Sequence, residues 1–157
     1  MRNSNDTLGL ICSHGGHLTE LLELSEAFEG FDVFYICYEA DTTRNLEKVY
    51  LRPNRPYSPI QFVRNVVSYW RIFSKERPAW IVSTGAEIAV PAFLIAKVRG
   101  IRTIYVECGA QVTRPSMTGR ILVHVADYFY VQWPELKAYY GEKALYVGSL
   151  VDELKSV

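Results

Sequence analysis

The chain has 157 residues, of which 49% are hydrophobic and 22% are charged, and its formal net charge is zero. This length and composition are those of one globular domain with a sizeable core, which excludes disordered and fibrous chains. Cys12, Cys37 and Cys108 are far apart and lie within apolar runs. We therefore expect reduced, mostly buried thiols of a cytosolic protein and no disulfide framework.

The sequence lacks the signal of a membrane span but has a strong charge asymmetry along the chain. No stretch of the sequence approaches the ~18 consecutive apolar residues that a membrane span requires, and residues 1–7 are too polar for a secretory signal. We expect no transmembrane helix and at most peripheral membrane contact. The net charge is −7 over residues 1–43, +9 over 44–120 and −2 over 121–157. The basic middle segment suggests an anionic partner such as a phosphate, a lipid headgroup or nucleic acid, although solvated helix faces explain the same counts.

Strands and helices alternate along the chain. Short β-rich apolar runs predict six strands, at residues 8–12, 33–38, 80–83, 103–106, 128–132 and 144–147. Helical spacing predicts helices at residues 17–28, 62–74, 90–98, 118–126 and 135–139, and the prolines in residues 41–59 predict an irregular loop. The fold class is therefore α/β: one Rossmann-like domain over residues 1–157, with a parallel sheet and helices on both faces.

Ligands of such sheets bind beyond the carboxyl ends of the strands, so the residues after each strand are candidate site residues. The turn after the first strand opens a helix and consists of Ser13, His14, Gly15, Gly16 and His17. The backbone N–H groups of a glycine turn at a helix start suit a phosphate. The spacings of dinucleotide sites and P-loops are both absent, and an ordinary tight turn is the alternative.

The two histidines of this turn are candidates for different chemistry. A zinc site with Cys12, His14 and His17 lacks a fourth ligand nearby, and Cys12 is expected in the core, so we predict no metal site. At the start of a helix the uncharged imidazole of His17 is favoured, and it can act as a base. A polar side chain that caps the helix is the alternative interpretation.

Two further strand ends carry polar groups. Thr84 and Gly85 belong to a small-residue turn after the third strand, whereas Glu107 ends the fourth strand. Glu107 could position a substrate hydroxyl; pairing with an arginine or capping of backbone N–H groups is the alternative. Arg114 and Ser116, which follow it, are candidate phosphate contacts.

The predicted helix at residues 62–74 combines a wide apolar face with flanking basic residues. A basic amphipathic helix with a tryptophan can lie in a membrane interface. The alternative is that the apolar face packs on the sheet, as any helix there requires. The candidate membrane contacts are Phe62, Val66, Trp70, Arg71, Phe73 and Lys75.

Four motifs carry a resemblance to a known family. They are S-H-G-G-H-L-T-E-L, S-T-G-A-E-I-A-V-P, Y-V-E-C-G-A-Q-V-T-R-P-S-M-T-G-R and D-Y-F-Y-V-Q-W. In this order they resemble the membrane-associated subunit of the two-chain N-acetylglucosaminyltransferase of lipid-linked oligosaccharide synthesis and its bacterial PssD-type exopolysaccharide homologues. The resemblance spans residues 8–150. That family is similar to the N-terminal half of MurG-type glycosyltransferases of the GT-B fold, which act on polyprenyl-diphosphate sugars.

The resemblance implies a division of labour between two chains. This chain would bind a polyprenyl-diphosphate saccharide acceptor at the cytoplasmic face of the membrane, and a donor-binding partner subunit would supply most of the site for a UDP-sugar, either UDP-GlcNAc or a related donor. His17 would be the general base and Glu107 the strand-end acid. The residues that would line the cleft are Gly15, Gly16, Thr84 and Gly85.

The same resemblance leaves two alternatives open. One is a catalytically silent scaffold that recruits the partner to the membrane, and the other is a free-standing nucleotide-binding Rossmann protein. No cofactor is expected. No nucleic-acid partner is expected either, because the basic residues are not interleaved with exposed aromatic residues in any recognisable nucleic-acid-binding module.

Overall fold

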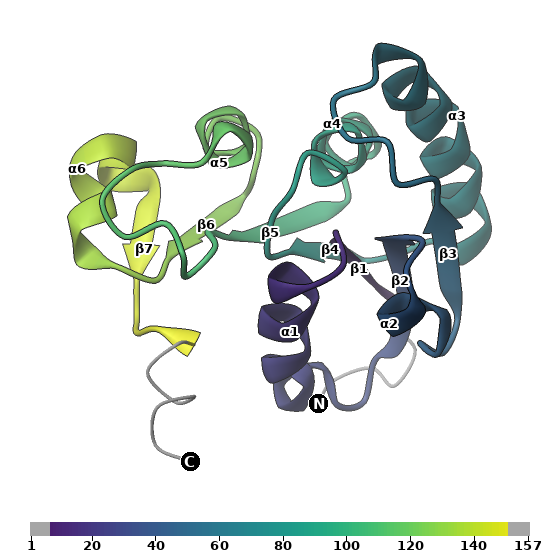
Figure 1. Ribbon diagram of the computed structural model, residues 1–157, viewed down its shortest axis with the longest axis horizontal. Coiled ribbons are helices and arrows are strands. Elements are labelled where there is room, and N and C mark those ends of the chain that lie inside the picture. The colour runs from purple at the N-terminus through teal and green to yellow at the C-terminus, as the bar shows by residue number, and fades with distance from the viewer. Residues whose placement is uncertain (1–6, 151–157) are drawn as a thin grey trace.

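The computed structural model describes residues 7–150, which form one parallel sheet with helices on both faces (Figure 1). Within this range seven strands follow the order β3-β2-β1-β4-β5-β6-β7, and all neighbours are parallel. The predicted Rossmann-like α/β class is confirmed. The strands are β1 (Thr7–Cys12), β2 (Asp32–Tyr38), β3 (Val49–Arg52), β4 (Trp80–Ser83), β5 (Arg102–Val106), β6 (Tyr128–Val131) and β7 (Ala144–Tyr146).

The helices cover the two faces unequally. Figure 1 shows α3, α4 and α5 on one face of the sheet and α1 on the other. The larger core lies beneath the first group and includes Tyr69, Phe73 and Phe93, whereas Leu18 and Leu21 pack in a smaller cluster under α1. The helices are α1 (Gly16–Glu23), α2 (Asp41–Arg44), α3 (Pro59–Glu76), α4 (Ala89–Arg99), α5 (Met117–Leu122) and α6 (Lys137–Tyr140), with 3-10 turns at Ser25–Phe28, Pro134–Leu136 and Gly141–Lys143.

Local sequence signals explain where the two long helices begin and end. The Ser58 hydroxyl accepts a hydrogen bond from the Gln61 N–H at 3.3 Å, and Pro59 occupies the first turn of α3. Both features favour a helix start. Helix α4 ends at Gly100, whose φ of 67° is a left-handed conformation that glycine adopts at low cost.

The sequence prediction misses the edge strand β3. The prolines predict an irregular loop over residues 41–59. In the structure, residues 49–52 pair with β2, with Val49 opposite Tyr35, and residues 41–44 form a helical turn. All four residues of β3 are half-buried. The strand therefore lacks both the continuous apolar run and the clear alternation by which strands are recognised in a sequence.

Two predicted helices are shorter than expected. Helix α1 ends at Glu23 and is followed by a separate 3-10 turn, and α5 ends at Leu122 instead of continuing to residue 126. Across residues 7–150, none of the helices combines the length and the apolar character needed to span a bilayer.

The sheet topology brings three of the predicted loops together at one edge of the sheet. Because the strands are parallel, the loops after β1, β4 and β5 all leave the same edge of the sheet. These three strands are consecutive in the sheet order. Residues 13–15, 84–88 and 107–116 therefore lie together, although up to about a hundred residues separate them in the sequence.

Candidate functional site

A polar cavity of about 550 Å³ lies where these loops meet, a volume in the range of small-molecule sites. The loop between β3 and α3 forms another part of its wall. Among the predicted site residues, the cavity is lined by Ser13, His14, His17 and Ser116. The other polar wall residues include Tyr38, Asn54, Glu87 and Gln111.

His17 is held in one orientation by the turn after β4. Its Nδ1 lies 3.0 Å from the carbonyl oxygen of Thr84, and the Thr84 hydroxyl donates to the carbonyl of His17 at 2.6 Å. A carbonyl oxygen can only accept, so Nδ1 carries the ring hydrogen of the neutral imidazole. Nε2 is then the nitrogen that can take up a proton from a group in the cavity.

Gly85 makes room for this histidine. Its φ is 135°, which side-chain-bearing residues rarely adopt, and a Cβ there would lie 2.6 Å from Cε1 of His17. The Gly85 N–H donates to the Ser83 hydroxyl at 3.1 Å, and Thr84 is fully buried. The prediction that Thr84 and Gly85 line the cleft is therefore wrong, because both residues are buried behind His17 and neither is among the residues that line the cavity.

The glycine turn before α1 remains open to a ligand. Gly15 and Gly16 are exposed, Gly15 has a φ of 76°, and no side chain caps the helix. The first N–H groups of α1 and the positive end of its dipole therefore suit an anion beside the cavity. Nε2 of His14 accepts a hydrogen bond from the Asn54 amide at 2.9 Å, which links this turn to the loop after β3.

Glu107 lies beneath the cavity and does not project into it. The residue is fully buried, and its carboxylate accepts hydrogen bonds from the Cys108 N–H at 3.1 Å and the Ser116 hydroxyl at 3.0 Å. It also accepts from the hydroxyls of Tyr105 and Tyr140. The predicted direct contact with an acceptor hydroxyl is therefore wrong, and the alternative, a carboxylate that caps backbone N–H groups, describes the geometry.

The loop after β5 is clamped around this carboxylate. Burial, followed by the hydrogen bond to Glu107, raises the pKa of Tyr140, so its hydroxyl remains a donor. A Cβ at Gly119 would collide with the Glu107 carboxylate and the Tyr140 hydroxyl, so only glycine fits there. A second carboxylate, that of Glu20 on α1, accepts from the Gly109 N–H at 3.1 Å. Residues 107–119 are thus fixed by buried acidic groups on two sides.

The two predicted phosphate contacts in this loop differ in placement. The Ser116 hydroxyl accepts from the Gly119 N–H at 2.8 Å, which caps α5, and it donates to Glu107. Its hydrogen is therefore used within the protein, although the residue lines the cavity. Arg114 is exposed and is not among the cavity-lining residues. Neither the Ser116 hydroxyl nor the Arg114 guanidinium is therefore available in the cavity as a hydrogen-bond donor to a phosphate.

Sequence reasoning missed two paired groups in the wall. Tyr38, the last residue of β2, donates a hydrogen bond to Glu87 at the start of α4. Burial, with the Glu87 hydrogen bond, raises the pKa of the Tyr38 hydroxyl, which therefore remains protonated. The position of Tyr38 at a strand end, and the place of Glu87 in the S-T-G-A-E turn, are signals that could have indicated them.

Helix α3 presents an apolar surface to solvent. Ile60 and Val63 are 68% and 61% exposed, and Val67 and Trp70 are each 49% exposed. The buried face of this helix includes polar Gln61 and Asn65, which hydrogen-bond to each other at 2.8 Å. The predicted alternative, packing on the sheet, therefore describes Tyr69, Ile72 and Phe73, which are buried, and not these four exposed residues.

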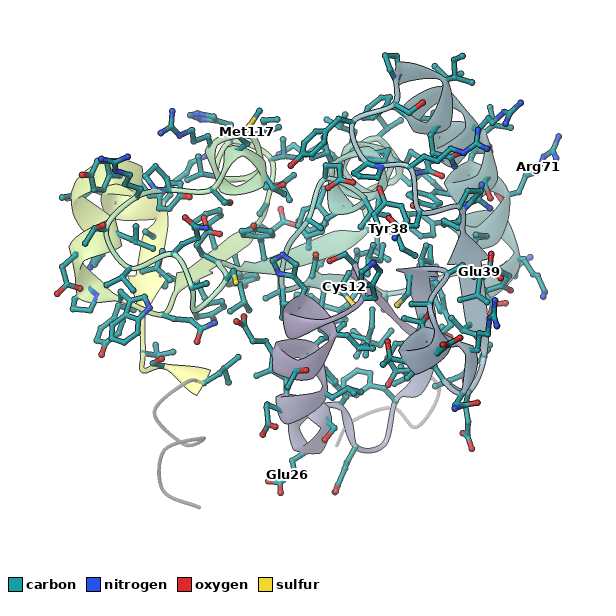
Figure 2. The ribbon with its side chains drawn as sticks, viewed as in Figure 1. Cys12, Glu26, Tyr38, Glu39, Arg71 and Met117 are labelled. Atoms are coloured by element: carbon teal, nitrogen blue, oxygen red, sulfur yellow. The ribbon has the colours of Figure 1, made fainter. Side chains whose placement is uncertain are left out.

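The predicted membrane contacts divide between the two faces of α3. Phe62 and Trp70 are exposed, and Figure 2 shows Arg71 pointing away from the protein. Val66 is half-buried, and Lys75 is exposed and donates to the Tyr50 hydroxyl at 3.0 Å. Phe73 is fully buried in the core. Its prediction as a membrane contact is wrong, because it lies on the face of the helix that packs against the sheet.

Comparison with known proteins assigns the family. The profile described as "Oligosaccharide biosynthesis protein Alg14 like" matches residues 44–150, more than half of the chain. The chain belongs to this family. The human protein named UDP-N-acetylglucosamine transferase subunit ALG14 is 28% identical over 177 aligned positions, which cover 90% of this chain and 82% of the relative. The predicted resemblance to a family of glycosyltransferase subunits is confirmed.

Solved structures show the same fold in larger chains. The MurG of Acinetobacter baumannii superposes with a TM-score of 0.75 at 16% identity over 90% of this chain. A UDP-N-acetylglucosamine 2-epimerase from Rickettsia bellii gives 0.76 at 12% identity over 96%. The chain spans only 45% and 47% of these two proteins, in agreement with the predicted half of a GT-B fold.

Proposed function

We propose that this chain is the acceptor-binding, membrane-associated subunit of a two-component UDP-sugar glycosyltransferase. Its donor is UDP-N-acetylglucosamine or a related sugar, and its acceptor is a polyprenyl-diphosphate-linked saccharide. Residues 1–157 form the single acceptor-side domain. The observation that carries the proposal is that His17 lines a polar cavity while its Nδ1 is hydrogen-bonded to the Thr84 carbonyl, which leaves Nε2 as the proton acceptor, in a protein of this family.

His17 acts as the general base of an inverting transfer. A hydroxyl of the acceptor saccharide donates to Nε2 while its oxygen attacks the anomeric carbon of the donor sugar. The bond from that carbon to the UDP oxygen breaks, UDP leaves with the bonding electron pair, and Nε2 takes up the hydroxyl proton. The Thr84 carbonyl retains its hydrogen bond from Nδ1–H and stabilises the imidazolium that forms.

The acceptor diphosphate lies at the glycine turn. Gly15 and Gly16 expose backbone at the N-terminus of α1, where N–H groups and the helix dipole attract negative charge. His17 directly follows Gly16 in the sequence. The start of α1 therefore carries both the proposed anion site and the proposed base.

The donor side of the site comes from a partner subunit. The face of the sheet that carries α1 has a separate apolar pocket of about 390 Å³, lined by residues 24–28, by β4–β6 and by residues 147–150. Its wall includes Phe28, Val106 and Tyr130, and Val147 at its edge is 82% exposed. An apolar surface of this kind supports docking of another chain.

The exposed surface of α3 holds the subunit at the membrane. Val63 and Val67 lie beside Arg64 and Arg71 around a shallow hollow on this helix. Apolar side chains enter the acyl boundary, and the arginines attract anionic headgroups. We place the protein at the cytoplasmic face as a peripheral membrane protein.

The proposal is tested by replacing His17 with alanine in the complex with its donor-binding partner. We expect turnover to fall about 10²-fold or more, because a positioned base is lost, while complex formation is retained. The matched control is His124→Ala, since His124 is exposed and is not among the residues that line the cavity. Wild-type turnover of His17→Ala in an intact complex would favour the silent scaffold, and robust transfer by the isolated chain would contradict the division between two subunits.

A further inference from the structure

A second cavity adjoins the polar one on the side of α3. It has a volume of about 430 Å³ and lies between the first turns of α3 and α4 and helix α5. The two cavities share wall residues, so they lie directly next to each other. The shared residues are Tyr38, Tyr57, Glu87, Met117 and Thr118.

The chemistry of the wall changes at this boundary. The second cavity, here called the apolar groove, is lined by hydrophobic side chains, namely Phe62, Val63, Ile88, Val90, Met117 and Ile121. Two amide side chains also line it, and Gln61 Nε2 donates a hydrogen bond to Asn65 Oδ1. The Glu87 carboxylate is bound to Tyr38 at the boundary. The groove therefore offers a hydrocarbon ligand mainly apolar contact, and these hydrogen bonds lower the cost of covering its polar groups.

The groove lies between the polar cavity and the exposed surface of α3. Val63 lines the groove and also the hollow that contains Arg64 and Arg71. Figure 2 shows Met117 on α5 and Arg71 on the far side of α3. A ligand that leaves the polar cavity through the groove thus emerges at the surface proposed to face the membrane.

A cationic side chain lies at the junction. Arg55 lines the groove, whereas its neighbours Asn54 and Pro56 line the polar cavity. Arg55 is exposed, and a guanidinium on this loop can bind phosphate oxygens. The residue therefore suits a phosphate group that joins an apolar chain to a polar head.

We propose that the apolar groove binds the first isoprenoid units of the acceptor lipid, with Arg55 contacting the diphosphate at the junction. This inference rests on the proposed function, since it specifies how the lipid-linked acceptor lies in that site. The order of compartments matches the order of groups in such a ligand: saccharide near His17, diphosphate between Gly15 and Arg55, and hydrocarbon along Phe62, Val63 and Ile121. The groove sets the depth at which the saccharide reaches the base.

Photoaffinity labelling tests the groove without requiring turnover. The probe is farnesyl diphosphate with a diazirine on its hydrocarbon chain, applied to the assembled complex. We expect labelled peptides from residues 57–65 and 117–122. Unlabelled farnesyl diphosphate should compete, whereas inorganic pyrophosphate and farnesol should each compete more weakly, because each supplies one half of the ligand.

Exposed groove residues can be changed with little risk to folding. Met117 and Ile121 are 71% and 47% exposed, and the double variant Met117→Glu/Ile121→Glu should lower labelling at least about tenfold, because it removes apolar contact. Arg55→Gln should lower labelling and abolish the competition by pyrophosphate. The matched control Val98→Glu, at an exposed position of α4 that is not among the groove residues, should label as the wild type does.

Three results would overturn the inference. They are labelling confined to other segments, undiminished labelling of the double variant, and equal labelling by a diazirine fatty acid, which would make the groove a site for membrane acyl chains. The proposed function fails separately, if the complex shows no transfer or if His17→Ala keeps wild-type turnover. Normal transfer with unlabelled groove peptides would leave the function standing and reject the groove.

Discussion

Replacement of Glu107 by glutamine tests what the buried carboxylate contributes. One oxygen, Oε1, accepts from the Cys108 N–H at 3.1 Å and the Tyr105 hydroxyl at 3.3 Å. The other, Oε2, accepts from the N–H and hydroxyl of Ser116 and from the Tyr140 hydroxyl. An amide keeps one acceptor oxygen and replaces the other with a donor. One of these two sets of donors must therefore face an NH₂ group.

The smaller loss arises if the NH₂ group replaces Oε1. Two hydrogen bonds to a charged acceptor are then lost, each worth about 1.5–3 kcal/mol, although the Tyr105 hydroxyl can rotate and accept instead. We expect the free energy of unfolding to fall by about 2–4 kcal/mol. For a domain of this size, each kcal/mol lowers the melting temperature by about 2–4 °C, so the expected change is about 5–15 °C.

Urea and thermal unfolding followed by circular dichroism measure this change. The matched control is Glu23→Gln, because Glu23 is exposed, and we expect it to stay within about 0.5 kcal/mol of the wild type. In the assembled enzyme, Glu107→Gln should raise the acceptor KM, since residues 108–118 form part of the cavity wall. Wild-type stability combined with lost turnover would refute the reasoning, because the carboxylate would then act on the substrate.

Three further predictions concern the site, the membrane surface and the buried hydroxyls. Gly85→Ala should lower turnover about tenfold or more by displacing His17 from its hydrogen bond, measured by steady-state kinetics of the complex. Val67→Glu/Arg71→Glu should reduce flotation with anionic liposomes, because both apolar burial and charge attraction are weakened. Burial raises the pKa of Tyr140 above its ordinary value of about 10, so unfolding free energy should fall as pH rises above that value; Tyr140→Phe should reduce this slope in urea titrations.

Controls separate these effects from general damage. Gly30 also has a positive φ, of 85°, but no atom lies within 4 Å of its added Cβ, so Gly30→Ala should change stability without changing turnover. Tyr139→Glu, at a 61% exposed position of α6, should leave flotation unchanged. Equal loss of turnover in both glycine variants, flotation insensitive to the α3 substitutions, or stability independent of pH above about 10 would contradict the corresponding prediction.

The sequence by itself indicates six of the seven strands in residues 7–150 and the loops that carry the site. Continuous apolar runs mark the buried strands, and small polar residues directly after them mark the carboxyl edge of the sheet. These signals depend only on residues that are neighbours in the sequence, so they can be recognised without knowledge of the fold. Strand β3 lacks them, because an edge strand with four half-buried residues is stabilised by its pairing to β2 more than by its own composition.

Only the tertiary structure decides which way each side chain points. Phe73 and Trp70 are aromatic residues three positions apart on one helix, yet one is fully buried and the other is 49% exposed. Glu107 is drawn inward by donors on Ser116 and Tyr140, nine and 33 residues further along the chain. A buried carboxylate must be satisfied by whichever donors the packing brings to it. The role of such a residue therefore depends on contacts between distant segments, which its own position at a strand end does not specify.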